Sequence, residues 1–236
     1  MSLKAVFFDL DGTLLPMDMD VFIKSYFGAI SQKLAPHGYD PHELVSAIWK
    51  GTGAMLKNDG TVNNEQVFWN SFVSIYGEER LKDTVWFDKF YEENFDDLKS
   101  VCGFNPEASE TVHRLKDKNL RLVLATNPLF PSIATEKRIR FAGLEPEDFE
   151  FFTSYENIGY SKPNIMYYQE ILSRTGLNAD ECLMVGNDVE DDMIAEKLGM
   201  KVFLLTDCLI NKDDIDISVY PNGDYAALNA YIDSLI

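Results

Sequence analysis

Two aspartates, Asp9 and Asp11, directly follow an apolar, β-prone run of residues 4–8 and directly precede a Gly-Thr turn. A short apolar run bounded by turn signals is typical of a fully buried strand, and in open α/β sheets ligands bind beyond the carboxyl ends of the strands. Two carboxylates there can act as a nucleophile and as a general acid or base. We therefore expect Asp9 and Asp11 to face an active-site crevice, although aspartates at strand ends are often only solvated turn residues.

Polar residues also follow three later strands that the sequence predicts. Thr126-Asn127 follows residues 122–125, Gly186-Asn187-Asp188 follows residues 182–185, and Lys162 follows residues 151–153 after a short loop. Each signal alone has an ordinary explanation as a turn hydroxyl, a surface lysine or a solvated helix start. Because the carboxyl ends of parallel strands meet at one edge of a sheet, their joint order indicates a shared site.

The rest of the sequence predicts the elements that position these residues. Helical spacing of apolar residues predicts four helices before residue 103 and four after it, over residues 17–36, 40–57, 65–77, 80–100, 112–118, 136–141, 165–175 and 191–198. Strands alternate with the later helices, and residues 202–205 complete a set of five strands. We therefore predict an α/β fold: a Rossmann-like, doubly wound parallel sheet from residues 1–15 and 103–236, with an inserted all-helical domain at residues 16–102.

The amino-acid composition excludes some classes of binding partner. The 236 residues include 21 Lys plus Arg against 39 Asp plus Glu, a net charge of −18, which argues against nucleic acid or an anionic membrane as a partner. The sequence has no apolar run of membrane-spanning length, and its first residues predict a core strand rather than a signal peptide, so we expect a cytoplasmic monomer or homodimer. The three cysteines form no metal-binding pattern, and the three histidines suggest no Ser-His-Asp triad.

The motifs resemble those of the haloacid dehalogenase superfamily. They are Asp9-Leu10-Asp11-Gly12-Thr13, then Thr126, Lys162, and Gly186-Asn187-Asp188 with Asp191 or Asp192. The inserted helices resemble the helical, C1-type cap of that superfamily, and the whole chain looks like a phosphoglycolate phosphatase. The resemblance implies a phosphohydrolase that requires Mg²⁺, forms an aspartyl-phosphate and acts on a small phosphorylated metabolite.

The resemblance also implies roles for individual residues. Asp9 would be the nucleophile and Asp11 the general acid and base, while Thr126, the Asn127 backbone N–H and Lys162 would hold the phosphoryl group. Magnesium would be bound by Asp9, by the Asp11 backbone carbonyl and by the loop that holds Asn187 and Asp188. The superfamily usually has Asp where this chain has Asn187, so either Asn187 or Asp188 is the metal ligand, and either Asp191 or Asp192 is the further acid.

Other activities of the superfamily are alternatives. A dehalogenase does not need Asp11, and a phosphonatase needs a lysine in the cap, for which Lys50 and Lys57 have no recognisable context. A phosphomutase shares both aspartates and is the second candidate enzyme, while a non-catalytic phospho-ligand sensor would not need the complete set of motifs. Residues 57–61 form a turn that either contacts the leaving group or is an ordinary surface turn.

Overall fold

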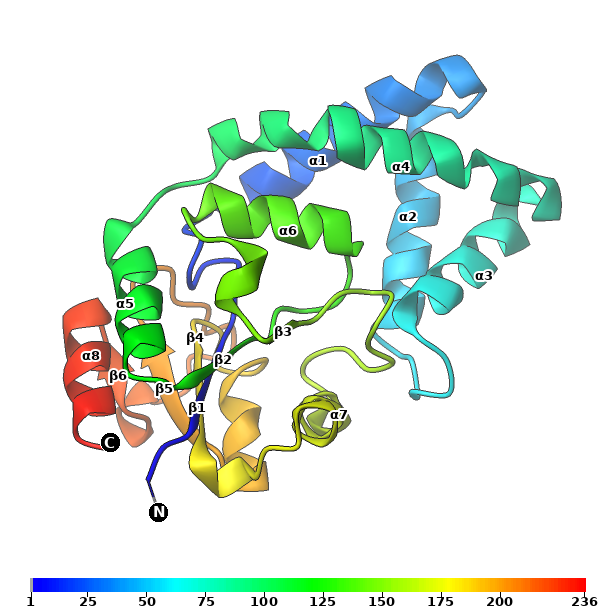
Figure 1. The fold of residues 1–236 in the computed structure, drawn as a ribbon. Helices are drawn as coiled ribbons and strands as arrows, with labels where there is room; N and C mark the ends of the chain where they lie inside the picture. The colour runs from blue at the N-terminus through cyan, green and yellow to red at the C-terminus, as the bar shows by residue number, and fades with distance from the viewer. Residues whose placement is uncertain (1) are drawn as a thin grey trace.

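A six-stranded parallel sheet forms the centre of the molecule in the computed structural model, which describes residues 2–236 (Figure 1). The strands, in chain order, are β1 (Ala5–Phe8), β2 (Arg121–Leu124), β3 (Phe151–Phe152), β4 (Cys182–Gly186), β5 (Lys201–Leu205) and β6 (Asn222–Gly223). Their spatial order is β3-β2-β1-β4-β5-β6, so β1 lies between β2 and β4. This confirms the predicted α/β class.

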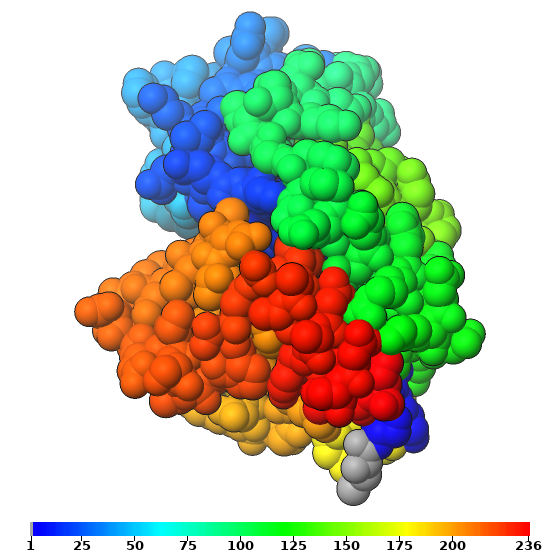
Figure 2. Space-filling model, turned by 90° about the vertical axis from the view of Figure 1, so that its left-hand side faces the viewer, coloured from blue at the N-terminus to red at the C-terminus, as the bar shows by residue number. Residues whose placement is uncertain are grey.

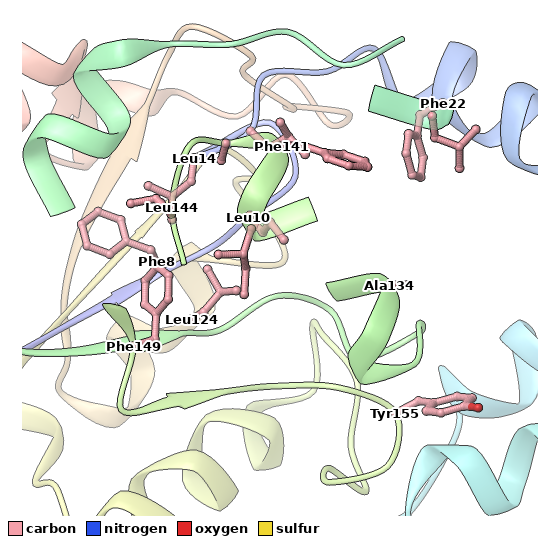
Figure 3. Close-up of a cluster of buried hydrophobic side chains, with 14 of the residues drawn as sticks. Phe8, Leu10, Leu14, Phe22, Leu124, Ala134, Phe141, Leu144, Phe149 and Tyr155 are labelled. Carbon is pink, nitrogen blue, oxygen red and sulfur yellow. The ribbon is translucent and has the colours of Figure 1, made fainter. Parts of the chain in front are cut away.

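Helices cover both faces of the sheet. Alternate residues of β1 point to opposite faces, as strand geometry requires: Val6 and Phe8 belong to one hydrophobic cluster, and Ala5 and Phe7 to the other. Helices α5 (Pro106–Asp117), α6 (Ser132–Phe141) and α8 (Tyr225–Asp233) contribute to the first cluster, part of which Figure 3 shows around Phe8. Helix α7 (Ile165–Thr175) and a 3₁₀ helix (Met193–Leu198) contribute to the second.

A wholly helical segment lies between β1 and α5. Its α-helices are α1 (Met19–Leu34), α2 (Pro41–Met55), α3 (Asn64–Tyr76) and α4 (Thr84–Glu93), and its 3₁₀ helices are Ala35–His37, Glu78–Asp83 and Phe95–Val101. Asp18, Asp40 and Asn63 accept hydrogen bonds from the first turns of α1, α2 and α3, which fixes where these helices start. Figure 2 shows this blue-to-green segment above the orange and red end of the chain.

The structure corrects two of the expected helices and contains two elements that were not predicted. Of the expected helix 80–100, only Thr84–Glu93 is α-helical, since Glu78–Asp83 and Phe95–Val101 are 3₁₀ helices. The second 3₁₀ helix returns the chain to Cys102, which forms an isolated β-bridge with Met17 between the two connections to the segment. The expected helix 191–198 is a shorter 3₁₀ helix, because Asp188 accepts hydrogen bonds from the backbone N–H groups of Glu190 and Asp191 and closes a turn. Strand β6 and helix α8 were not predicted: β6 has two residues and no apolar run.

The remaining short elements are 3₁₀ helices at Pro146–Asp148, Ala179–Glu181 and Ile217–Val219. Within residues 2–236, the structure contains no helix that is both long and apolar enough to cross a membrane.

Candidate active site

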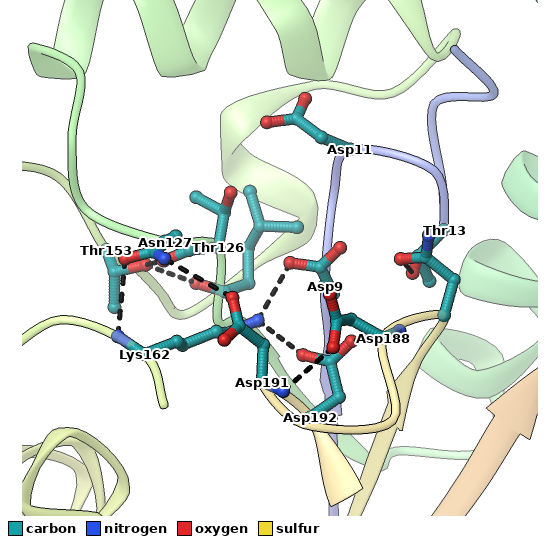
Figure 4. Close-up of polar contacts among 12 residues, drawn as sticks. Asp9, Asp11, Thr13, Thr126, Asn127, Thr153, Lys162, Asp188, Asp191 and Asp192 are labelled. Carbon is teal, nitrogen blue, oxygen red and sulfur yellow. Dashed lines mark hydrogen bonds and ion pairs between the residues drawn. The ribbon is translucent and has the colours of Figure 1, made fainter. Parts of the chain in front are cut away.

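A buried ion cluster lies at the carboxyl edge of the sheet, where β1 and β4 end (Figure 4). Lys162 Nζ donates hydrogen bonds to Asp9 Oδ1 at 2.8 Å and to Asp192 Oδ1 at 2.6 Å. All three side chains are at least nine-tenths buried. The sequence analysis expected Asp9 and Lys162 at one site, and of the two candidate acids it is Asp192, not Asp191, that pairs with the lysine.

The cluster contains two carboxylates for one ammonium group. Burial opposes the charge of Lys162, but Asp192 and Asp9 overcome it and hold the lysine pKa well above its usual range. Burial raises the pKa of Asp192 to about 7, with Asp9 adding to the effect and Lys162 opposing it. Because one ammonium group balances only one of the two carboxylates, the site has excess negative charge and favours either a proton or a cation.

Thr126, Asn127 and Asp191 lie beside this cluster. Thr126 is 2% exposed, and its backbone carbonyl accepts hydrogen bonds from Thr153 Oγ1 at 2.6 Å and from Tyr167 Oη at 2.8 Å, which fixes the loop after β2. Asn127 Oδ1 accepts from the Lys162 backbone N–H at 3.3 Å, so the loop after β2 is tied to the loop that carries the lysine. Burial raises the pKa of Asp191 to about 6.

In the loop after β4, the side chains of Asn187 and Asp188 make different contacts. Asn187 Oδ1 accepts from Thr13 Oγ1 at 3.0 Å, and its Nδ2 donates to the Cys208 carbonyl at 2.7 Å. Gly12 has a φ of +84°, and a Cβ there would lie 2.4 Å from Asn187 Nδ2, so the motif glycine permits this close contact. Asn187 therefore joins the loops after β1 and β4, whereas Asp188 uses only Oδ1 in its turn and retains Oδ2.

The oxygen atoms near the ion cluster fit a magnesium ion only if water molecules supply the remaining ligands. No three His, Cys, Asp or Glu side chains of residues 2–236 converge closely enough to hold a metal ion by themselves. Proteins commonly hold Mg²⁺ through one or two carboxylates, with water completing the octahedron. Asp9 and Asp188 each retain a carboxylate oxygen beyond their hydrogen bonds, both line the same cavity, and the excess negative charge of the cluster favours a cation.

Asp11 lies apart from the ion cluster and points away from it (Figure 4). Its Oδ2 accepts a hydrogen bond from the guanidinium of Arg138 on α6, while its Oδ1 is buried without a hydrogen-bond partner. Burial raises the pKa of Asp11 above its usual value, with Arg138 opposing the rise. A carboxyl group with one free buried oxygen and a raised pKa is suited to give and take a proton.

The sequence analysis missed Arg138. Its side chain is 1% exposed, its guanidinium lies 4.6 Å from the centre of the Phe130 ring, and it also donates to Thr135 Oγ1 at 3.3 Å. A usable signal existed, because Arg138 is four residues from both Ala134 and Ala142, which are fully buried. This spacing places the arginine on the apolar face of α6.

A cavity of about 490 Å³ extends from these residues toward the helical segment. Its polar end contains Asp9, Asp11, Thr126 and Lys162, and its other walls come from α1 to α4 and from the loop after β2. Trp49 and Trp69 are among the lining residues, whereas Lys50 and residues 57–61 are not. In the turn, Asn58 donates instead to the Val62 carbonyl and to Asn64 Oδ1, both at 2.9 Å, so this geometry favours an ordinary structural turn.

Comparison with known proteins identifies the class. Residues 3–199 match the family model of the haloacid dehalogenase-like hydrolases, and the chain belongs to that family. It is 29% identical to the glyceraldehyde 3-phosphate phosphatase of Methanothermobacter thermautotrophicus, over 92% of this chain and 95% of that protein. It is 25% identical to the phosphoglycolate phosphatase of Aliivibrio fischeri, over 87% of this chain and 85% of the relative.

The crystal structure of a phosphatase of this superfamily from Thermococcus onnurineus has the same fold. Its TM-score is 0.59 at 17% identity, and the match covers 98% of each chain. The expected family and the expected likeness to phosphoglycolate phosphatases are thus confirmed, and the chain is an enzyme of the hydrolase class.

Proposed function

We propose that this chain is a Mg²⁺-dependent phosphohydrolase that cleaves the phosphate monoester of a small metabolite through an aspartyl-phosphate on Asp9. One observation carries the proposal: the Asp9 carboxylate lies at the cavity end of β1, with one oxygen held by Lys162 and the other not engaged by the lysine. Such a carboxylate is positioned to attack phosphorus. This reaction class is supported by relatives that are named phosphatases and that match this chain over most of their length.

Asp9 and Asp11 would carry out different steps of the reaction. An Asp9 oxygen forms a bond to phosphorus as the ester P–O bond breaks, and Asp11 gives its proton to the leaving oxygen. Asp11 then takes a proton from the water molecule that opens the acyl phosphate, which restores both side chains. Because Asp11 points toward Arg138, its carboxyl group has to rotate toward the phosphoryl site before either proton transfer.

The other residues would hold the phosphoryl group. The Thr126 hydroxyl and the Asn127 backbone N–H would donate to its oxygens, and Lys162 would balance part of their charge. The Asp9 carboxylate, Asp188 and the Asp11 backbone carbonyl would hold Mg²⁺, which supplies further positive charge at the transferring oxygens. Asn187 and Asp192 would position this set through Thr13 and Lys162.

The helical segment would act as a cap over this site. We assign residues 1–15 and 103–236 to the catalytic core and residues 16–102 to the cap, because the cavity lies between them and the two connections pair at Met17 and Cys102. A cap on two adjacent connections can open for the substrate and close to exclude water. A cytoplasmic location, as the sequence analysis expected, is part of this proposal.

Phosphate release tests this proposal. Purified protein would be assayed on phosphate esters with MgCl₂ or with EDTA, beside Asp9→Asn and the control Asp97→Asn, which changes an exposed aspartate far along the chain. We expect turnover that requires Mg²⁺, is reduced at least about 10³-fold by Asp9→Asn and is unchanged by Asp97→Asn. Equal rates for wild type and a folded Asp9→Asn variant would refute the proposed nucleophile.

A further inference from the structure

The wall that the helical segment contributes to the cavity is uncharged. Of the described residues that line the cavity, those from α1 to α4 and from Leu56 are all apolar, aromatic or, in Thr52, a neutral hydroxyl. Phe22, Phe27 and Trp49 belong to this wall, and the Phe27 and Trp49 rings lie 5.3 Å apart. Trp49 lines the cavity and is 48% exposed, so its ring is accessible for contact.

The cationic groups near the cavity all lie outside the wall that the helical segment contributes. Lys162 is held between Asp9 and Asp192, and Arg138 donates to Asp11. Lys212, the other lysine among the lining residues, is exposed on the loop after β5, where its charge acts on Asp191. A carboxylate held against this wall would thus lose water beside aromatic rings that offer it no counter-charge, which is unfavourable.

The two tyrosine hydroxyls of the aromatic wall bond to each other. The hydroxyls of Tyr26 and Tyr91 form a hydrogen bond of 2.9 Å. Sugar hydroxyls would lose their water without gaining enough partners here, because unpaired buried polar groups are costly. The volume of about 490 Å³ nevertheless leaves room for a sizeable group beyond the phosphoryl end.

From this wall we infer the substrate class: a phosphate monoester whose leaving group is uncharged and largely apolar, such as a benzyl-sized aromatic or branched alkyl alcohol. The inference rests on the proposed phosphohydrolase function and assigns its specificity to the Phe22, Phe27 and Trp49 wall. It distinguishes this chain from relatives named for phosphoglycolate, whose leaving group carries a carboxylate, and from the relative named for glyceraldehyde 3-phosphate, whose leaving group is uncharged but polar.

Steady-state kinetics with MgCl₂ would compare benzyl phosphate with phosphoglycolate. Both release a primary alcohol, so intrinsic leaving-group reactivity does not dominate the comparison. We expect kcat/KM for benzyl phosphate to exceed that for phosphoglycolate on the order of 100-fold, because even one buried methylene can change kcat/KM 10-fold or more. A higher kcat/KM for phosphoglycolate would overturn the inference and leave the proposed phosphatase function intact.

A charge placed in the wall gives the reciprocal test. Trp49→Arg should lower kcat/KM for benzyl phosphate and raise it for phosphoglycolate, so that their ratio falls at least about 10-fold. Leu81→Arg is the matched control, because Leu81 belongs to the same segment and is 46% exposed but does not line the cavity. An unchanged ratio in Trp49→Arg, or an equal change in Leu81→Arg, would contradict the assignment of specificity to this wall.

Binding measurements test the substrate class independently of whether the chain hydrolyses any ester. Calorimetry with MgCl₂ would compare 2-phenylethylphosphonate with 3-phosphonopropionate, which replace the bridging oxygen of the two esters by a methylene group. If no ester is hydrolysed, the proposed function fails, while tighter binding of 2-phenylethylphosphonate still supports an apolar phosphomonoester site. Tighter binding of 3-phosphonopropionate, or binding of neither compound, would overturn the inference.

Discussion

The pair formed by Asp11 and Arg138 makes an asymmetric prediction about stability. Their side chains are 16% and 1% exposed, and the other hydrogen bonds of the arginine go to neutral groups, the Ala134 carbonyl and Thr135 Oγ1. Each residue is therefore the main counter-charge of the other. An aspartate that loses its partner can take up a proton, whereas an arginine cannot lose one, since its pKa is too high.

The two single variants should therefore respond differently to pH. In Arg138→Met, Asp11 would fold protonated, and holding that proton costs about 1.4 kcal/mol for each pH unit above its unfolded pKa of about 3.9. The loss of unfolding free energy is then at most about 4 kcal/mol at pH 7 and at most about 1.5 kcal/mol at pH 5, because burial already raises the pKa of Asp11 in the wild type. In Asp11→Asn the buried arginine stays charged, so the loss should be about 3–5 kcal/mol at both pH values.

The double variant completes a double-mutant cycle for the Asp11 and Arg138 pair. Asp11→Asn with Arg138→Met leaves two neutral side chains and should be more stable at pH 7 than the sum of the single losses by at least about 2 kcal/mol. The measurement is urea-induced unfolding followed by tryptophan fluorescence and circular dichroism at pH 5 and pH 7, with EDTA to remove metal ions. Additive losses within about 0.5 kcal/mol, or a loss in Arg138→Met that does not depend on pH, would refute the argument.

Three further outcomes follow from the ion cluster. Folding raises the pKa of Asp192 to about 7, so between pH 4 and pH 7 the folded chain holds a proton that the unfolded chain has released. The unfolding free energy of the metal-free protein should therefore fall as the pH rises from 4 to 7. Urea titrations at a series of pH values can measure this fall. Calorimetric Mg²⁺ affinity should rise over pH 5.5–7.5, because protons on Asp191 and Asp192 weaken the attraction for a cation, and a pH-independent affinity would contradict this. Gly186→Ala would place a Cβ 2.0 Å from Asp192 Oδ2 and should cost about 1–3 kcal/mol in thermal or urea unfolding, whereas Gly199→Ala loses stability only through its φ of +89°.

The residues of the ion cluster could be predicted because sheet topology brings them together. Asp9 and the loop with Asp192 follow β1 and β4, which are neighbours in the sheet, and Thr126 follows β2 on the other side of β1. Alternating apolar runs and turn residues identify such strands in a sequence. The side-chain partners are less predictable: Asp191 and Asp192 are adjacent, and only the direction of the turn after Asp188 decides which one reaches Lys162.

Arg138 and the 3₁₀ helices show where local patterns fail. Lys137 and Arg140 form ion pairs with exposed carboxylates, and these neighbouring charges mask the helical spacing that places Arg138 on the apolar face. Its burial depends on how α6 packs against the sheet edge and on the position of Asp11, which lies 127 residues away in sequence. Apolar periodicity likewise continues past Asn94, where Phe95 and Leu98 remain buried although the α-helix has ended.

The charges of the site explain why a helical segment with neutral walls suits the polar motifs at the sheet edge. Lys162 cannot balance a dianionic phosphoryl group while it is shared by Asp9 and Asp192, so phosphate binding depends on an added cation or on protons. A further anionic group on the substrate would increase that demand, and the neutral walls from α1 to α4 offer nothing to meet it. In the proposed enzyme, the residues at the sheet edge would select the phosphoryl group by charge, and the helical segment would select the rest of the molecule by apolar contact. Changes in one should therefore leave the selectivity of the other largely unaltered.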